Sequence, residues 1–96
     1  MRASKRGAAA RRAWIVYVLV SKVSGRTYVG IALDAKTRLA QHNGKQPGGA
    51  KSTRAHRPWG IAKRYGPFDT RGEAQHVEHA VKRLRGRARL RFAPDA

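Results

Sequence analysis

A small set of side chains in this sequence has the chemical types that could together cut a phosphodiester bond. They are two phenols, a guanidinium, an imidazole and a carboxylate: Tyr17, Tyr28, Arg38, His42 and Glu78. Such a reaction needs a group that removes a proton from water, a cation beside the phosphate oxygens and an oxygen ligand for a metal ion. A tyrosine or histidine, an arginine and a glutamate can supply these functions in turn.

The charge of the chain favours a polyanionic partner. The 96 residues have room for one domain, and 22 Lys and Arg against five acids give a net charge of +17. Nucleic acid is the first expectation, because binding many phosphates releases counterions, and an anionic membrane surface is the second. No apolar run approaches the roughly 20 residues of a membrane span, and no signal peptide is recognisable, so we expect no membrane partner. The absence of cysteine excludes disulfides and thiolate zinc sites and suits a bacterial-type cytoplasm, near the nucleoid.

The elements that must position these side chains begin with a hairpin. The apolar run AWIVYVLV at residues 13–20 predicts a strand buried on both faces, and TYVGIA at residues 27–32 returns after a Ser24-Gly25 turn. If the loop has an even length, Tyr17 shares a face with Tyr28 and Gly30, whereas an odd length would separate them. We favour the even register.

The first helix follows directly from this hairpin. Asp34 is a good N-cap for AKTRLAQHN, and Gly44 is a good residue to end the helix. Two basic residues occupy its inward stripe, whose members at helical spacing are Ala35, Arg38, Leu39 and His42. Residues 44–60 then form a long, positively charged loop, which in so small a domain is more often functional than idle.

The second half of the chain predicts one more strand and one more helix. WGIAKRY at residues 59–65 reads as a strand closed by Gly66-Pro67, and Thr70 with Glu73 forms a capping box for a helix over residues 71–84. Glu78 stands at the edge of the buried stripe of that helix, which contains Ala74, Val77, Val81 and Leu84. We therefore predict a single domain over residues 13–85, between a flexible basic arm at 1–12 and a basic tail at 86–96. An arginine at every second position of the tail favours an extended strand or an arm that orders on an anion.

These motifs together resemble the GIY-YIG nuclease family. VYV at residues 16–18 and YVG at 28–30 are similar to its two half-motifs, and TRLAQHN looks like its first helix. The segments RLAQHNG, GGAKSTR and RPW resemble in particular the nuclease domain of Slx-type structure-specific endonucleases, and EHAVK looks like the motif around the catalytic glutamate. Ile15 and Val16 stand near the position where the family has the glycine of its first half-motif.

The resemblance implies an α+β fold, a small three-stranded antiparallel sheet flanked by helices in the order β-β-α-β-α. It implies a DNA endonuclease that uses Mg²⁺ or Mn²⁺ and leaves a 5′-phosphate and a 3′-hydroxyl. Tyr17 would be the general base or would position the water, Tyr28 would hydrogen-bond the water or the phosphate, and Arg38 would stabilise the phosphorane. His42 would assist this chemistry or contact the phosphate, and Glu78 would bind the metal. DNA would be contacted at Gly30, Lys36, Asn43, Lys45, Lys51 and Arg54.

Each of these residues also has an ordinary structural interpretation. The tyrosines can be strand aromatics, Gly30 can mark a bulge, and Glu78 can pair with Lys82 on the next helical turn. The alternative function is a non-catalytic nucleic-acid-binding module on the same scaffold. Slx-type enzymes carry a zinc-binding module, and without cysteine we expect no cysteine-based module of this kind here. The DNA structure that is cut, or RNA in its place, is not fixed by the sequence. The oligomeric state is not fixed either, and a monomer is the expectation.

Overall fold

Strand β1 (Trp14–Ser21) lies in the middle of a three-stranded antiparallel sheet. It pairs with β2 (Thr27–Ala32) on one side and with β3 (Trp59–Phe68) on the other, which gives the order β2-β1-β3. This arrangement comes from a computed structural model, which describes residues 13–93. Residues 16–19 of β1 are all buried, as expected for a strand that is covered on both faces.

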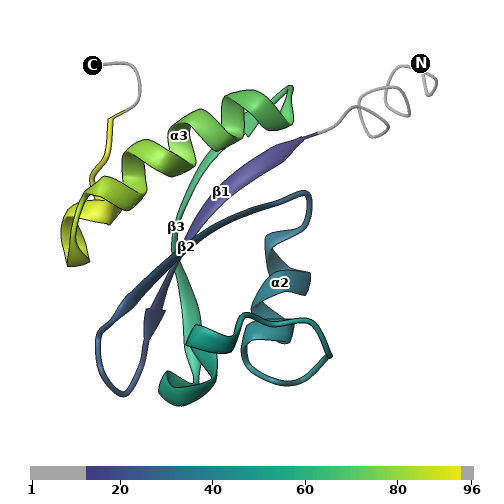
Figure 1. The fold of residues 1–96 in the computed structure, drawn as a ribbon, viewed down its shortest axis with the longest axis vertical. Coiled ribbons are helices and arrows are strands. Elements are labelled where there is room, and N and C mark those ends of the chain that lie inside the picture. The colour runs from purple at the N-terminus through teal and green to yellow at the C-terminus, as the bar shows by residue number, and fades with distance from the viewer. Residues whose placement is uncertain (1–12, 94–96) are drawn as a thin grey trace.

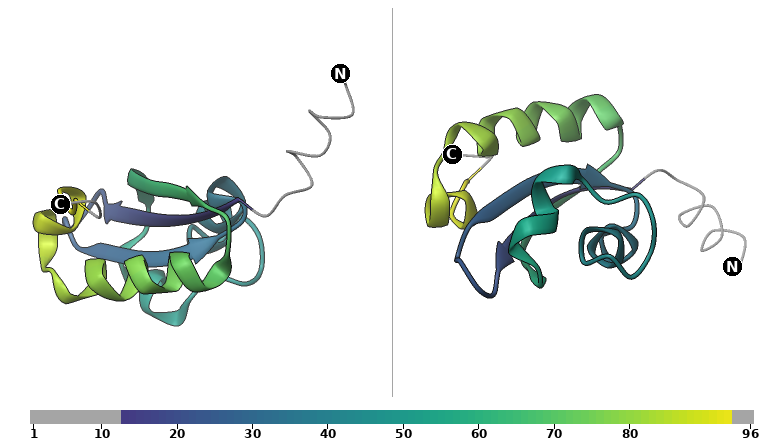
Figure 2. Two further views of the ribbon diagram at one scale, coloured as in Figure 1. Left: turned by 90° about the horizontal axis from the view of Figure 1, so that it is seen from above. Right: turned by 60° about the horizontal axis from the view of Figure 1, so that its bottom comes forward.

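Helices cover the two faces of the sheet and form a three-layer domain (Figures 1 and 2). Helix α3 (Arg71–Arg83) packs on the face that carries Val16 and Val18. Helix α2 (Ala35–His42) and the short 3₁₀ helix η1 (Lys51–His56) lie on the opposite face, where Tyr17 and Leu19 are buried. The predicted α+β fold and element order are confirmed. No helix in the described part of the chain is long and apolar enough to cross a membrane.

Both predicted helix starts are confirmed by their hydrogen bonds. The Asp34 carboxylate accepts from the backbone N–H groups of Lys36 and Thr37, and so satisfies two free donors at the start of α2. The hydroxyl of Thr70 accepts from the backbone of Glu73, and the Glu73 side chain accepts from the backbone of Thr70. This reciprocal capping box fixes where α3 begins and therefore which of its residues face the sheet.

Strand β3 is longer than predicted. It continues past Gly66-Pro67 to Phe68, which pairs with Trp14, while Tyr65 pairs with Val16. Two residues of β3 thus stand opposite one residue of β1, which is the arrangement of a β-bulge. The bulge accommodates Pro67, which cannot donate a hydrogen bond to the ladder.

The start of the predicted tail is also different: it is neither an extended strand nor a free arm. Residues 86–90 form a second 3₁₀ helix, η2 (Gly86–Leu90), and Leu90 and Phe92 pack against the core beneath α3. The Tyr65 hydroxyl donates to the Arg89 carbonyl over 2.5 Å and accepts from the backbone N–H of Phe92 over 3.0 Å. The packed unit thus continues beyond residue 85. The predicted arm at 1–12 and residues 94–96 lie outside the described residues.

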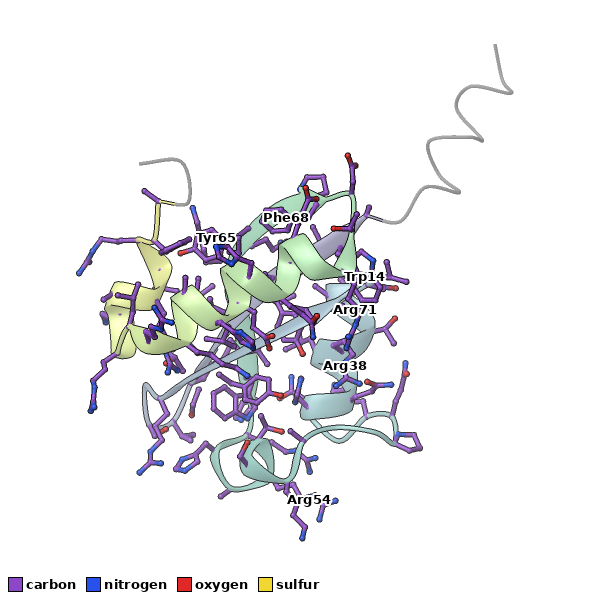
Figure 3. All side chains as sticks on the ribbon, turned by 45° about the horizontal axis from the view of Figure 1, so that its top comes forward. Trp14, Arg38, Arg54, Tyr65, Phe68 and Arg71 are labelled. Atoms are coloured by element: carbon purple, nitrogen blue, oxygen red, sulfur yellow. The ribbon has the colours of Figure 1, made fainter. Side chains whose placement is uncertain are left out.

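The Arg89 side chain explains why this turn docks where it does. Its guanidinium donates to the carbonyls of Leu84 and Lys82 at the end of α3, over 2.8 and 3.0 Å, and to the Thr27 hydroxyl over 3.0 Å. Carbonyls in the last turn of a helix have no partner within it, so the arginine satisfies groups that would otherwise need water. Figure 3 shows Tyr65 beside this docked segment.

Candidate active site

The strand register places the two tyrosines on one face of the sheet. Tyr17 pairs with Gly30, and Leu19 pairs with Tyr28. Directly paired residues and residues two apart along a strand share a face, so these four positions face α2 together. The predicted even register is confirmed.

Gly30 is required by the Tyr17 side chain. A Cβ atom at position 30 would lie 2.5 Å from the Tyr17 hydroxyl oxygen and 2.7 Å from Cζ. The phenol ring therefore crosses β2 over the bare glycine and carries its hydroxyl toward the free edge of the sheet, because β2 is an edge strand. This packing accounts for the glycine, and its contact with DNA stays a prediction.

Tyr17, Tyr28 and His42 form a compact cluster of rings. The ring of Tyr28 lies 4.6 Å from that of His42 and 6.4 Å from that of Tyr17, between ring centroids. The Tyr17 hydroxyl lies 2.9 Å from Nε2 of His42. Tyr17 and His42 are buried, at 1% and 0% exposure, whereas Tyr28 is half-buried and accessible from solvent.

The second nitrogen of His42 is also bonded. Its Nδ1 lies 3.0 Å from the hydroxyl oxygen of Thr53, which in turn donates to the Ala50 carbonyl over 2.7 Å. Gly49 makes this approach feasible, because a Cβ there would collide with the Gln41 carbonyl at the end of α2. Sequence reasoning gave Thr53 no role, although the residue lies in the GGAKSTR segment that resembles Slx-type nucleases.

Charge and burial shift two pKa values in this cluster. Burial, together with the nearby charges of Arg38 and Arg57, lowers the pKa of His42, so the ring is neutral at pH 7. Burial raises the pKa of Tyr17; the nearby Arg38 opposes this rise, and Tyr28 and Glu78 add to it. The hydrogen bonds of Arg38 itself go to Oε1 of Gln41 and to the Gly48 carbonyl. Arg57 was another residue that sequence reasoning missed, and its Nε donates to the His42 carbonyl over 2.6 Å.

Glu78 belongs to the other layer of the domain, on the face of the sheet opposite to the ring cluster. It lies on α3, which contacts β2 and β1. Its charge nevertheless acts on the Tyr17 hydroxyl, which points toward the edge of the sheet. The Glu78 side chain is 13% exposed, and its Oε2 lies 3.2 Å from Nζ of Lys82, so the anticipated ion pair is present. A helical pair of this kind contributes only about 0.3–0.5 kcal/mol and leaves the carboxylate free for another role.

With Glu78 as its single carboxylate ligand, a metal site here suits a hard cation that keeps most of its bound water. Residues 13–93 contain no cluster of three or more His, Asp or Glu side chains able to hold a metal ion. Mg²⁺ is commonly held by one or two carboxylates, with water and substrate phosphate completing its shell, and Glu78 can supply one such ligand. A zinc or calcium cage, which needs several protein donors, does not fit these residues.

The remaining predicted contact residues lie around this centre. Lys36, Lys45, Lys51 and Arg54 are exposed, and Figure 3 shows Arg54 extending from η1 away from the sheet. Asn43 is used within the protein, because its amide donates to the Trp59 carbonyl and accepts from the Trp59 N–H, over 3.0 and 2.7 Å. A basic hollow of about 710 Å³ at the end of α3 was not predicted, and its cations are Arg26, Lys82, Arg83, Arg85 and Arg89.

Comparison with known proteins identifies relatives of this arrangement. Residues 13–91 match the model of the GIY-YIG catalytic domain. The chain is 52% identical over 46 residues to the structure-specific endonuclease subunit SLX1 of Cryptococcus neoformans, a match that covers 45% of this chain and 9% of the relative. For the slx1 subunit of Schizosaccharomyces japonicus the identity is 46% over 48 residues, covering 48% of this chain and 18% of the relative.

A bacterial relative matches over more of the chain. A UPF0213 protein of Nitratidesulfovibrio vulgaris is 39% identical over 70 residues, which cover 73% of this chain and 60% of the relative. The chain thus spans less than a fifth of the two SLX1 relatives and somewhat over half of the bacterial protein. The family match covers nearly the whole described structure and every residue of the site, and on that basis the chain belongs to the GIY-YIG family.

Proposed function

We propose that the protein is a divalent-metal-dependent endonuclease that hydrolyses phosphodiester bonds in single-stranded or branched DNA. The observation that carries this proposal is the hydrogen bond between Tyr17 and neutral His42, beside the charges of Arg38 and Glu78. A module that only coats DNA has no need of a buried phenol bonded to an imidazole. The names of the fungal relatives, structure-specific endonuclease subunits, support the same class of reaction.

The hydrogen bond permits proton transfer without a free phenolate. As a water oxygen bonds to phosphorus, the proton of the water passes to the Tyr17 oxygen, and the Tyr17 proton passes to Nε2 of His42. The raised pKa of Tyr17 is compatible with this step, because the phenol gives up its proton only while it gains another. Since Tyr17 is 1% exposed, the water has to approach from the side on which Arg38 and Glu78 act.

Arg38 and Tyr28 would stabilise the negative charge that develops on the phosphate during this transfer. The positive charge of Arg38 acts on Tyr17 and would neutralise charge that builds up on the phosphate oxygens. The half-buried Tyr28 hydroxyl can orient the phosphate or the water. The bond from phosphorus to the 3′ oxygen breaks, and the leaving oxygen takes a proton from solvent water, which gives a 3′-hydroxyl and a 5′-phosphate.

Glu78 would hold Mg²⁺ or Mn²⁺. When bound, the ion supplies positive charge to the phosphate and its leaving oxygen. Lys82, whose Nζ lies 3.2 Å from Oε2 of Glu78, would compete with the ion for this carboxylate. Neutralising Glu78 also removes one of the contributions that raise the pKa of Tyr17.

The basic surface provides the contacts to DNA. Its cations are the exposed lysines and arginines of α2 and the loop after it, together with those of the basic hollow at the end of α3. Contacts of this type go to phosphates and position the strand without reading its sequence. This suits an enzyme that recognises the form of its DNA.

Cleavage assays with one pair of matched variants test this proposal. Labelled single-stranded, duplex and flapped DNA are incubated with Mg²⁺ or Mn²⁺, with EDTA as control. Glu78→Gln should abolish cutting and keep DNA binding, whereas Glu73→Gln makes the same charge change on the same helix within a capping box that glutamine can maintain, and should cut normally.

Two outcomes would contradict the proposal. If Glu78→Gln and Glu73→Gln cut DNA equally well, Glu78 is not needed for the reaction. Binding without cutting on every substrate would favour the non-catalytic module.

A further inference from the structure

Thr53 is a completely buried polar residue to which the proposed reaction gives no role. It lies on η1 at 0% exposure, and its hydroxyl sits between Nδ1 of His42 and the carbonyl of Ala50. Three further features hold it in place. Its N–H donates to the Ala50 carbonyl over 3.2 Å, its own carbonyl accepts from the Trp59 indole over 2.7 Å, and the tight approach at Gly49 fixes the loop before it.

The direction of each hydrogen bond follows from counting protons. A threonine hydroxyl has a single proton, and a carbonyl oxygen can only accept. The contact of 2.7 Å with the Ala50 carbonyl therefore uses the Thr53 proton. The contact of 3.0 Å with His42 then requires that Nδ1 carries a proton and donates it to the Thr53 oxygen.

A neutral imidazole has only one N–H, so this assignment determines its other nitrogen. Nε2 of His42 is left with a lone pair, which accepts from the Tyr17 hydroxyl over 2.9 Å. The backbone N–H of Ala50 also points at Nδ1, but over 3.5 Å, which is beyond the usual range for such a bond. The two shorter contacts thus select one tautomer.

We propose that Thr53 is a positioning residue that holds His42 in the tautomer with its proton on Nδ1, and so keeps Nε2 free to receive the Tyr17 proton. The inference rests on the proposed nuclease function, because only a reaction uses this direction of transfer. In the opposite tautomer Nε2–H donates to the Tyr17 oxygen. Nε2 then cannot accept the phenol proton, and one lone pair of the phenol oxygen, which has to take the proton of the water, is already occupied.

Three substitutions separate this role from simple packing. Thr53→Val keeps the shape and removes the acceptor at Nδ1, so the Ala50 N–H becomes the neighbour that favours the opposite tautomer. Thr53→Ser keeps the hydroxyl. His42→Gln identifies the His42 signals among those of the four histidines.

The first measurement is the ¹⁵N spectrum of the histidine rings in the full chain, without DNA or metal. In the wild type, Nδ1 of His42 should give the pyrrole-like shift of a protonated nitrogen and Nε2 the pyridine-like shift of a free one. Thr53→Val should move both shifts toward the opposite assignment, and Thr53→Ser should restore them. A wild-type ring protonated on Nε2 would overturn the inference, however the variants fold.

The second measurement is the cleavage rate. Thr53→Val should lower kcat at least about 10-fold, within the roughly 10²–10⁴ that a positioned acid or base contributes, with little change in KM, and Thr53→Ser should recover most of it. A folded Thr53→Val protein with unchanged kcat would overturn the inference. If the wild type cuts no DNA, the nuclease proposal fails, and the spectrum still decides whether Thr53 places the ring proton.

Discussion

The contact between Gly30 and Tyr17 makes a quantitative prediction for Gly30→Ala. The new methyl carbon would lie 2.5 Å from the Tyr17 hydroxyl oxygen and 3.1 Å from Cε2, inside normal contact distance. Tyr17 is 1% exposed and its hydroxyl is bonded to His42, so the ring cannot move aside without losing that bond. The substitution should therefore disturb the fold and the site together.

The size of the effect follows from three contributions. Forcing an extra methyl into a packed core costs about 1–3 kcal/mol. Losing the bond between Tyr17 and His42 costs about 0.5–1.5 kcal/mol more. Alanine in place of glycine in a strand returns about 0.5–1 kcal/mol. The net loss of unfolding free energy is about 0.5–4 kcal/mol, which lowers Tm by roughly 2–30 °C in a domain of this size.

Urea unfolding with a matched control measures this difference. Gly60→Ala makes the same change in β3, where the new methyl would meet only the flexible end of Lys22, at 3.2 Å. Gly60→Ala should keep the wild-type midpoint or raise it slightly, since alanine gains about 0.5–1 kcal/mol over glycine in a strand, and Gly30→Ala should shift the midpoint to lower urea with an unchanged m-value. If Gly30→Ala is as stable as Gly60→Ala and only binds DNA less tightly, the glycine serves the approach of DNA, and the packing argument is wrong.

Three further predictions concern other parts of the molecule. The pKa of His42 is lowered in the folded protein, so below pH 6.5 the unfolded chain gains a proton that the folded protein excludes. The free energy of unfolding should therefore fall as the pH drops from 6.5 toward the folded pKa. His42→Gln should flatten this part of the profile of urea midpoint against pH. Tyr65→Phe should cost about 1–3 kcal/mol and speed amide exchange in residues 86–92, while exchange in α2 stays as it was, because the hydroxyl holds Arg89 and Phe92. Lys82→Met should tighten Mn²⁺ binding more than Lys63→Met does, because Lys82 pairs with Glu78 and Lys63 does not. The EPR signal of the free ion measures this binding. Equal effects of the two substitutions would show that the ion pair does not compete with the metal.

Local patterns allowed much of this fold to be predicted from the sequence. The caps at Asp34 and Thr70 depend on neighbours within three residues, so their residue types suffice to place the helix starts. The register of the hairpin depends only on the alternation of side chains and the parity of one short turn. These features alone predict that Tyr17, Tyr28, Arg38 and His42 lie in one region.

The features that sequence reasoning missed depend on contacts between distant segments. Thr53 acts on a helix eleven positions earlier, through a loop whose path is set by the close approach of Gly49 to α2. In the tail, the alternating arginines suggested an extended chain. Leu90 and Phe92 gave the better signal, since large apolar side chains among charges find a core. The role of Gly30 in making room for the Tyr17 ring could not be predicted from the sequence, because it depends on the position of that ring in the folded protein.

The central position of β1 determines how the protein unfolds and where its sequence can vary. Successive residues of β1 belong to two different cores, with Val16 and Val18 beneath α3 and Tyr17 and Leu19 beneath α2. The phenol thus sits in the last part of the molecule to open, and thermal inactivation should coincide with global denaturation instead of preceding it. New substrate preferences can then arise at low risk only in the periphery, at exposed cations such as Lys45, Lys51, Arg54 and Arg87.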